Sequence, residues 1–533
     1  MTPEQFIQLG EEGCNHVPVV RQLFADLDTP LSCYVKVARG PYSYLLESAA
    51  QGGEKWARYS VVGLRCSRVV KITGTHVTVE EDRVVTEEFD CDEPLAYIED
   101  LQKQFAYPDI EDLPIYTGGL VGYFGYDTVR YVEQRIMASM PEDKLGTPDI
   151  LLMVSNDVVV FDNVLGRIHI ITHADPNVAG SYDAAQLVLD DIVEKLQSNI
   201  PRDLHVPEVG PKLHEADFVS SYGEQAFMSD VEKIKDYIIE GDVMQVVLSQ
   251  WMSVSFESDP LNLYRSLRSL NPSPYMYFLD LEDFQIVSSS PEILARLDNG
   301  EVTVRPLAGT RRRGVDEAED LRLEEELLAD PKEIAEHLML IDLGRNDIGK
   351  VCQTGTVEVS EMMVVERYAH VMHIASNVRG RINPGLGAID LLRATLPVGT
   401  LSGAPKVRAM EIIDELEPEK RGIFGGAVGY LSWNGNMDTA IAIRTAIIRD
   451  NRLYVQAGAG VVADSIPKLE WLETLNKARS IIQASAMAEA GLDLQDITVE
   501  NLHIYDQAAS RPLVGLGGDA FDGGGASHVA DDR

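Results

Sequence analysis

The sequence predicts an α+β protein, in which strands and helices follow one another without regular β-α-β alternation. Residues 31–175 contain short apolar segments separated by turns, such as DILLMVSNDVVVFD and RIHIITH, which are typical of strands. Residues 181–200 have the apolar spacing of an amphipathic helix. From about residue 218 to 490 the patterns of helix and strand are mixed. These observations indicate sheets that are covered by helices.

The length of 533 residues is enough for two or three domains. Residues 201–217 contain three prolines and no hydrophobic period, so we expect a linker there. It separates an N-terminal domain of residues 1–200 from a second domain of residues 218–490. Residues 509–533 are rich in Gly and Asp, and we expect a disordered tail.

The second domain is expected to begin with a helix at 227–242 and a strand at 243–256, because its apolar period changes between them. Residues 400–418 indicate a loop that leads into a helix, with Ser402 as a candidate N-cap. Alternation predicts strands at 437–450 and 452–462.

A short motif occurs twice, as GGLVGY at 118–123 and as GGAVGY at 425–430. Two domains of related build would explain the repeat. A match of six residues also arises by chance, so both explanations stay open.

The composition excludes several classes of protein. The chain has 46 Lys and Arg against 85 Asp and Glu, a net charge of −39, which argues against nucleic-acid and anionic-membrane partners. We expect no signal peptide and no membrane-spanning segment, because no stretch has the required apolar length. The five cysteines are scattered and form no C-x-x-C pair, which fits a reducing cytoplasm.

Basic groups in this acidic chain are candidate anion sites. RPLAGTRRRG at 305–314 contains four arginines, and it is equally typical of a solvated surface turn. Arg444 lies inside an apolar segment, where a guanidinium needs either an internal carboxylate or an anionic ligand. Gly458 and Gly460 interrupt a predicted strand, which indicates a close approach of backbone to a ligand. Lys406, at the start of a predicted helix, also favours an anion.

Carboxylates at a spacing of three residues share a helix face and suit Mg²⁺, which takes oxygen ligands. Two such pairs occur, Glu333 with Glu336 and Glu470 with Glu473, although solvated pairs are common. His370 and His373 have metal-pair spacing, but no third ligand is indicated, so zinc is disfavoured.

GRNDIGKV at 344–351 is rejected as a phosphate-binding loop. Val351 replaces the Ser or Thr that would hold Mg²⁺, and a helical pattern precedes the motif.

The ordered motifs LLESA, NPSPYMYF, SSSPEIL, PLAGTRRRG, KEIAEHLMLIDLGRND, VMHIASNVRG, TLSGAPK, RGIFGGAVGY and QAGAGVVADS extend to about residue 485. They resemble the chorismate-utilising enzymes, and within them the large subunits of anthranilate synthase. The resemblance implies stacked antiparallel β-sheets flanked by helices. It also implies a lyase that converts chorismate and ammonia to anthranilate and pyruvate, the first step of tryptophan biosynthesis.

The resemblance assigns roles residue by residue. It implies Glu292 as the general acid for loss of the ring hydroxyl, His373 in the later loss of pyruvate, and Thr400 in the active site. Mg²⁺ would be held by Glu336 and Glu473. The substrate would be held by the loop around the four arginines and by Gly309, Thr310, Phe424, Arg444, Gly458, Ala459 and Gly460. Phe424 stands where several relatives have Tyr.

Small differences favour ammonia as the nucleophile. Relatives that make aminodeoxychorismate have a nucleophilic Lys where this chain has Ala308, and relatives that add water have a Lys base where it has Gln245. Ala308 disfavours aminodeoxychorismate synthase, which is kept as the alternative within the enzyme class, and a non-catalytic anion-binding regulatory protein is the alternative outside it. None of the five cysteines lies in the G-x-C-x-G turn of a glutaminase. We therefore expect a separate glutamine amidotransferase subunit, in a heterotetramer.

LLES at 45–48 and NPSPYMYF at 271–278 contain no useful grouping of catalytic residues. Residue types alone favour packing between domains. The resemblance instead implies a site for feedback inhibition by tryptophan, with contacts from Ser48, Pro274, Tyr275 and Met276.

Overall fold

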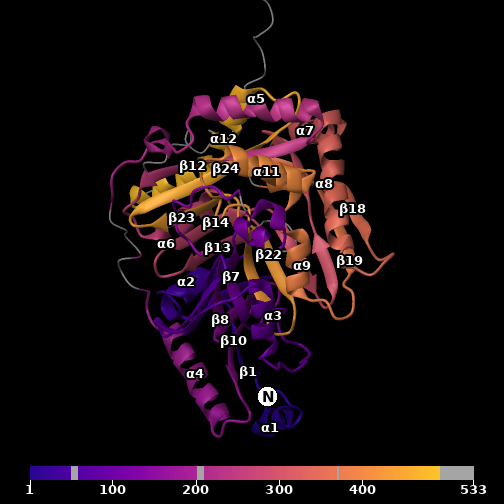
Figure 1. Cartoon of the computed structure of the whole chain (residues 1–533). Helices are drawn as coiled ribbons and strands as arrows, with labels where there is room; N and C mark the ends of the chain where they lie inside the picture. The colour runs from indigo at the N-terminus through magenta and orange to yellow at the C-terminus, as the bar shows by residue number, and fades with distance from the viewer. Residues whose placement is uncertain (50–57, 138, 201–203, 205–208, 369–370, 493–533) are drawn as a thin grey trace, which may run out of the picture.

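Two large antiparallel sheets, stacked face to face, form the centre of the molecule, and helices cover them (Figure 1). The computed structural model describes residues 1–49, 58–137, 139–200, 204, 209–368 and 371–492. The predicted α+β class with stacked antiparallel sheets is confirmed. The expected tail at 509–533, residues 201–203 and 205–208 of the expected linker at 201–217, and His370 lie outside the described residues.

The first sheet runs through both predicted domains. Its strands, in spatial order, are β1 (Val17–Phe24), β10 (Arg167–Ala174), β9 (Val158–Asp162), β3 (Tyr59–Gly63), β2 (Ser43–Glu47), β13 (Tyr275–Asp280), β14 (Gln285–Ser290), β23 (Thr445–Arg449), β24 (Arg452–Val461), β12 (Gln245–Ser255) and β11 (Val219–Ser220), with β20 (Gly403–Ala404) on β12.

The second sheet is also shared. Its order is β17 (Leu307–Arg312), β19 (Val371–Arg381), β16 (Glu301–Val304), β15 (Ile293–Asp298), β22 (Met437–Ile441), β21 (Ala427–Ser432), β7 (Gly119–Phe124), β8 (Ile150–Ser155), β4 (Arg68–Thr73), β5 (His76–Glu81) and β6 (Val84–Asp90), with β18 (Glu358–Arg367) on β19.

The helices begin where the sequence supplies caps. Asp330 accepts a hydrogen bond from the Lys332 backbone and precedes Pro331, which together start α8. The helices are α1 (Pro3–Glu11), α2 (Pro30–Val37), α3 (Pro94–Lys103), α4 (Ser181–Leu196), α5 (Glu224–Glu240), α6 (Pro260–Leu270), α7 (Glu317–Ala329), α8 (Pro331–Gly349), α9 (Ala388–Thr395), α10 (Gly399–Ser402), α11 (Lys406–Leu416) and α12 (Pro467–Glu489). None of them is both long and apolar enough to cross a membrane, among the residues described.

The two segments of the chain, residues 1–200 and residues 218–490, have related strand orders. From the centre of the first sheet, β2-β3-β9-β10-β1 runs one way and β13-β14-β23-β24-β12 the other. From the centre of the second, β7-β8-β4-β5 mirrors β21-β22-β15-β16. The repeated Gly-rich motifs lie in β7 and β21, which pair with each other so that Gly122 faces Gly429. Related build therefore explains the repeated motif better than chance.

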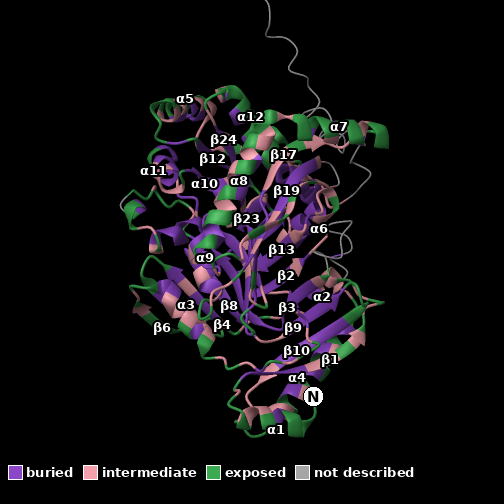
Figure 2. Ribbon diagram, turned by 90° about the vertical axis from the view of Figure 1, so that its right-hand side faces the viewer, coloured by how far each residue is buried: buried purple, intermediate pink, exposed green. Residues whose placement is uncertain are grey.

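The core lies between and around the sheets, as the burial of the strands shows (Figure 2). Side chains from both sheets and both segments share one apolar cluster, which includes Tyr44, Val121, Tyr277 and Val428. The two segments thus fold around common sheets.

Two local expectations were wrong. The strand expected at 437–450 is two strands, β22 and β23, which belong to different sheets. The break comes at Arg444, whose φ is +49°. Ser402 does not cap α11, because its hydroxyl donates to the Val398 carbonyl instead, and Pro405 occupies the N-cap position.

Candidate active site

Arg444 is the cation around which the site is built. It lies at the crossing from β22 to β23, and its backbone carbonyl accepts hydrogen bonds from Ser288 and Ser289. Its half-buried guanidinium makes no salt bridge with any residue that the structure describes. The sequence left two explanations for Arg444, an internal carboxylate and an anionic ligand. The described part of the chain contains no carboxylate that is paired with it. A half-buried guanidinium without one is suited to an anionic ligand.

The arginines of the 305–314 loop differ from Arg444, because acidic neighbours neutralise each of them. The pairs are Arg305 with Glu361 and Glu366, Arg311 with Glu326 and Asp330, Arg312 with Glu319, and Arg313 with Asp320. Lys406 is likewise paired, at 2.7 Å from Asp347. These ion pairs join the loop to β18, to α7 and to the start of α8, so its charges are already balanced within the protein.

The glycines of β24 lie beside Arg444. β23 accompanies β24 only as far as Val455, whereas β12 continues opposite Gly458, Ala459 and Gly460. Among the strands that the structure describes, none pairs with the other edge of this part of β24, and backbone N–H groups on such an edge can bind a carboxylate. An added Cβ at Gly460 would lie 2.4 Å from the Gln245 amide, so a larger residue there would displace the Gln245 side chain.

Glu292, in the turn between β14 and β15, is a buried carboxyl. Burial raises its pKa to about 8, although the Leu307 N–H, Arg444, Lys477 and the Thr400 hydroxyl each offset part of the rise. The carboxyl is consequently protonated at neutral pH and is able to donate a proton. Thr400 lies in α10, and its buried hydroxyl interacts with the Glu292 carboxyl and lowers its pKa.

His373, in β19, is a neutral imidazole of defined tautomer. Burial, and after it the charge of Arg444, lowers its pKa to about 4. Its Nδ1 lies 2.9 Å from the Gly309 carbonyl and 3.1 Å from the Thr310 hydroxyl. A carbonyl only accepts, so Nδ1 carries the hydrogen and Nε2 keeps a free lone pair.

Gly309 makes this contact through a special backbone conformation. Its φ of +64° lies in the left-handed region, within a bulge between Ala308 and Thr310 in β17. An added Cβ would come within 2.9 Å of the Leu327 side chain.

Carboxylates of α8 and α12 lie near this centre. The two expected pairs share helix faces, and burial together with the like charge of Glu336 raises the pKa of Glu333, as burial and Glu473 do for Glu470. A divalent cation would relieve this repulsion, and the donors are the oxygens that Mg²⁺ prefers. Within the residues described, no three metal-binding side chains are already assembled. The oxygen donors present here are therefore of the type that Mg²⁺ prefers.

Two functional candidates were missed from the sequence. Lys477 lies 2.8 Å from Glu473 and donates to the Gly458 carbonyl at 2.9 Å, so it joins the expected metal and substrate residues. Arg421 is buried between the rings of Tyr126 and Phe424 and donates to Glu417, Leu401 and Val247. The i, i+4 spacing of Glu473 and Lys477, and of Glu417 and Arg421, was the available signal.

Phe424 is buried, with 5% of its surface exposed. Apolar side chains and the Arg421 guanidinium surround its ring. Gln245 lies 3.4 Å from Glu336 through its side-chain nitrogen. An amide here has no basic lone pair, as the sequence argument required.

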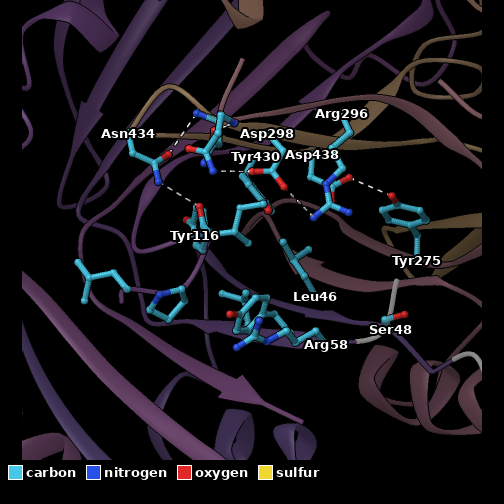
Figure 3. Close-up of a pocket in the computed structure, with 18 of the residues that line it drawn as sticks. Leu46, Ser48, Arg58, Tyr116, Tyr275, Arg296, Asp298, Tyr430, Asn434 and Asp438 are labelled. Atoms are coloured by element: carbon cyan, nitrogen blue, oxygen red, sulfur yellow. Dashed lines mark hydrogen bonds and ion pairs between the residues drawn. The ribbon is translucent and has the colours of Figure 1, made fainter. Parts of the chain in front are cut away.

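A second cavity, of about 570 Å³, lies apart from this centre and between the two sheets. Ser48, Pro274, Tyr275 and Met276 all line it, so residues distant in sequence meet as expected. Figure 3 shows Ser48 and Arg58 along one side and Arg296, Asp298 and Asn434 along the other. The Tyr275 hydroxyl donates to Asp438 at 3.0 Å, and Arg296 lies 3.7 Å from the same carboxyl.

The wall of this cavity carries a fixed carboxylate. Glu47 accepts hydrogen bonds from Nε and Nη2 of Arg268, both at 2.7 Å, and from the Tyr264 hydroxyl at 2.8 Å. Ser48, its neighbour, has a buried hydroxyl oxygen with no partner in the described residues.

Comparison with known proteins gives consistent results. Residues 43–483 match the family described as chorismate binding enzyme. The anthranilate synthase component 1 of Pseudomonas aeruginosa is 55% identical over 493 residues, 92% of this chain and 100% of that protein. That of Aquifex aeolicus is 47% identical, over 90% of this chain and 96% of that protein.

Solved structures agree in fold. Anthranilate synthase component I from Streptococcus pneumoniae has a TM-score of 0.72 at 38% identity, and the alignment covers 86% of this chain and 99% of that one. The menaquinone-specific isochorismate synthase of Escherichia coli has a TM-score of 0.64 at 18% identity, covering 90% and 98%, and shares the fold.

Proposed function

Since the chain belongs to the family of chorismate binding enzymes, we propose that it converts chorismate and ammonia to anthranilate and pyruvate, the reaction of an anthranilate synthase component 1. The observation that carries the proposal is the arrangement around Arg444. Its guanidinium makes no salt bridge in the described residues. Close to it lie the open edge of β24, the protonated carboxyl of Glu292 and the neutral imidazole of His373. Chorismate, with two carboxylates and a hydroxyl that must leave, matches these groups.

Glu292 acts in the first half of the reaction. Ammonia attacks the ring as the C–O bond to the ring hydroxyl breaks, and the protonated carboxyl gives its proton to the departing oxygen. The raised pKa of Glu292 keeps that proton available at neutral pH. Gln245 removes no proton from a nucleophile, which suits ammonia because ammonia attacks through its own lone pair.

His373 acts in the second half. Its free Nε2 accepts a ring proton, the electrons of that C–H bond form the aromatic ring, and the C–O bond breaks with its electron pair on oxygen. The enolate that departs takes up one proton at carbon to become pyruvate, and anthranilate remains. The Gly309 carbonyl holds Nδ1–H and thereby keeps the lone pair on Nε2. Thr310 and Thr400 complete the polar lining.

Glu336 and Glu473 are the residues that would hold Mg²⁺, with Glu333 and Glu470 behind them. When bound, the ion supplies positive charge to a substrate carboxylate. Lys477 orients Glu473 and keeps the pKa of that carboxyl below its usual range.

Ammonia is supplied by a separate glutamine amidotransferase subunit, in a heterotetramer with this chain. The name component 1, carried by the relatives, supports a partner component. All five cysteines are free thiols, which suits a reducing cytoplasm.

The 570 Å³ cavity binds tryptophan as a feedback inhibitor. Its size suits a small organic ligand, and Ser48, Tyr275 and Met276 offer polar and apolar contacts. Packing alone, the competing explanation, would leave no such cavity.

Chorismate binding tests the assignment of the site. Arg444→Met should weaken chorismate binding roughly 10- to 100-fold, because a charge-assisted hydrogen bond contributes about 1.5–3 kcal/mol. Arg313→Met is the matched control, since Asp320 already neutralises Arg313, and it should bind chorismate as the wild type does. Calorimetric titration with chorismate measures both. Equal affinity in the wild type and Arg444→Met would contradict the proposal.

A further inference from the structure

A smaller cavity of about 40 Å³ reaches Glu292 from the side of α8. Neither Arg444 nor the glycines of β24 line it, so it is separate from the surface that faces the substrate carboxylates. It lies between α8, the turn that carries Glu292, and the segment that leads from α9 into α10.

The size of the cavity restricts what it holds. A buried water needs about 10–15 Å³ of such space. The cavity therefore has room for one water molecule or a few, and it is too small for a six-membered ring.

The lining of the cavity is mainly apolar near its outer rim and polar at its inner end. Leu343, Gly344 and Val398 are half-exposed and form the outer rim. Leu294 and Leu340 are buried and apolar. The inner end carries the Glu292 carboxyl and the buried Thr400 hydroxyl, which interact with each other.

The remaining charged groups of the lining are already engaged. Asp347 accepts from Lys406 at 2.7 Å and from Lys350 at 3.1 Å, and Arg305 is paired with Glu361 and Glu366. Glu292 and Thr400 are thus the groups that a water molecule in this cavity would meet.

We infer that this cavity receives the water molecule that leaves the ring and returns a proton from solvent to Glu292. The inference rests on the proposed function. In the first half of the reaction the C–O bond breaks with its electron pair on oxygen, and the Glu292 proton converts that oxygen to water. A C–N bond forms to ammonia, and the resulting ammonium group releases one proton to solvent. The cavity water passes one proton back to the Glu292 carboxylate, so that protons balance over each turnover.

Filling the cavity tests the inference. Gly344→Ala places a methyl group, of about the volume of one water, at the rim, where its Cβ would lie 3.2 Å from the Val304 side chain. Gly349→Ala, on the same helix, is the control, because its Cβ would meet nothing within 4 Å. Gly344→Ala should lower kcat about tenfold and enlarge the solvent deuterium isotope effect, with KM for chorismate within twofold. Gly349→Ala should match the wild type.

A second measurement does not depend on the variant. A high-resolution crystal structure of the wild type should show ordered water bonded to the Thr400 Oγ1 and the Glu292 carboxyl. A dry cavity, or an active Gly344→Ala enzyme with wild-type kcat and isotope effect, would overturn the inference and leave the proposed function intact. Failure of the wild type to form anthranilate would instead contradict the proposed function itself.

Discussion

Glu292 and His373 show how surroundings alone give two residues opposite tasks. Both are buried, and burial disfavours charge on each of them. For a carboxyl the neutral form carries a proton to give, whereas for an imidazole it carries a lone pair that accepts one. The same physical cause therefore supplies the acid and the base of the proposed reaction at neutral pH.

The pH dependence of the reaction follows from Glu292. In the proposed mechanism the protonated form of Glu292 is the active one. Its pKa lies at about 8, so kcat/KM for chorismate should fall about tenfold per pH unit above pH 8. The profile is measured at a constant concentration of un-ionised ammonia, because ammonium otherwise titrates in the same range. A profile that stays flat from pH 7 to 10 would exclude Glu292 as the acid.

The sequence indicated which residues are candidates for the site better than it indicated which residues they contact. Arg444 and the basic loop looked alike as candidate anion sites, and only the fold places Glu319, Asp320 and Asp330 against the loop. The reach of Arg421 to Leu401 and Val247 joins residues up to 174 positions apart. Such contacts depend on tertiary structure, which local patterns do not contain.

At the scale of elements, β17 links the backbone to the chemistry. Its bulge and the left-handed Gly309 turn one carbonyl toward His373. The single strand expected at 437–450 was wrong for a related reason. Alternation indicated extended backbone there but not the turn at Arg444, which moves the chain from one sheet to the other.

Gly309→Ala tests this role of β17. A left-handed alanine costs about 1–2 kcal/mol, and its Cβ would press on Leu327, so the carbonyl should move away from His373. The second half-reaction should slow more than the first, and the amino intermediate should accumulate. Chromatographic quantification of intermediate and anthranilate measures the ratio.

The control for this variant is Gly355→Ala. Gly355 has a φ of +84° but open space around its Cα, so its substitution carries similar backbone strain away from the site. Equal product ratios in the Gly309 and Gly355 variants would argue against a positioning role for β17.

At the scale of the molecule, the doubled scaffold brings two distant segments into common sheets. β2 pairs with β13, and this contact forms the wall of the 570 Å³ cavity. A ligand there contacts both segments, and it inhibits only if it binds two arrangements of them with different affinity. Reciprocity then requires chorismate to weaken tryptophan binding by the same factor.

Ser48→Phe should fill this cavity and leave an active enzyme. The tryptophan concentration for half-inhibition should rise by about tenfold or more, since coupling between sites is typically worth 1–3 kcal/mol. Val209→Phe, on an exposed position, is a control for the added ring. Inhibition assays with chorismate near its KM measure the change. Wild-type sensitivity in the Ser48 variant would remove this cavity from regulation.

The most direct test of the central claim is an assay of the purified single chain for anthranilate fluorescence. With chorismate, Mg²⁺ and an ammonium salt, the account predicts anthranilate and an equal amount of pyruvate. With glutamine in place of ammonium it predicts no product, because no cysteine of the chain lies in a glutaminase turn. No anthranilate with ammonium, or turnover with glutamine by the chain alone, would contradict the account.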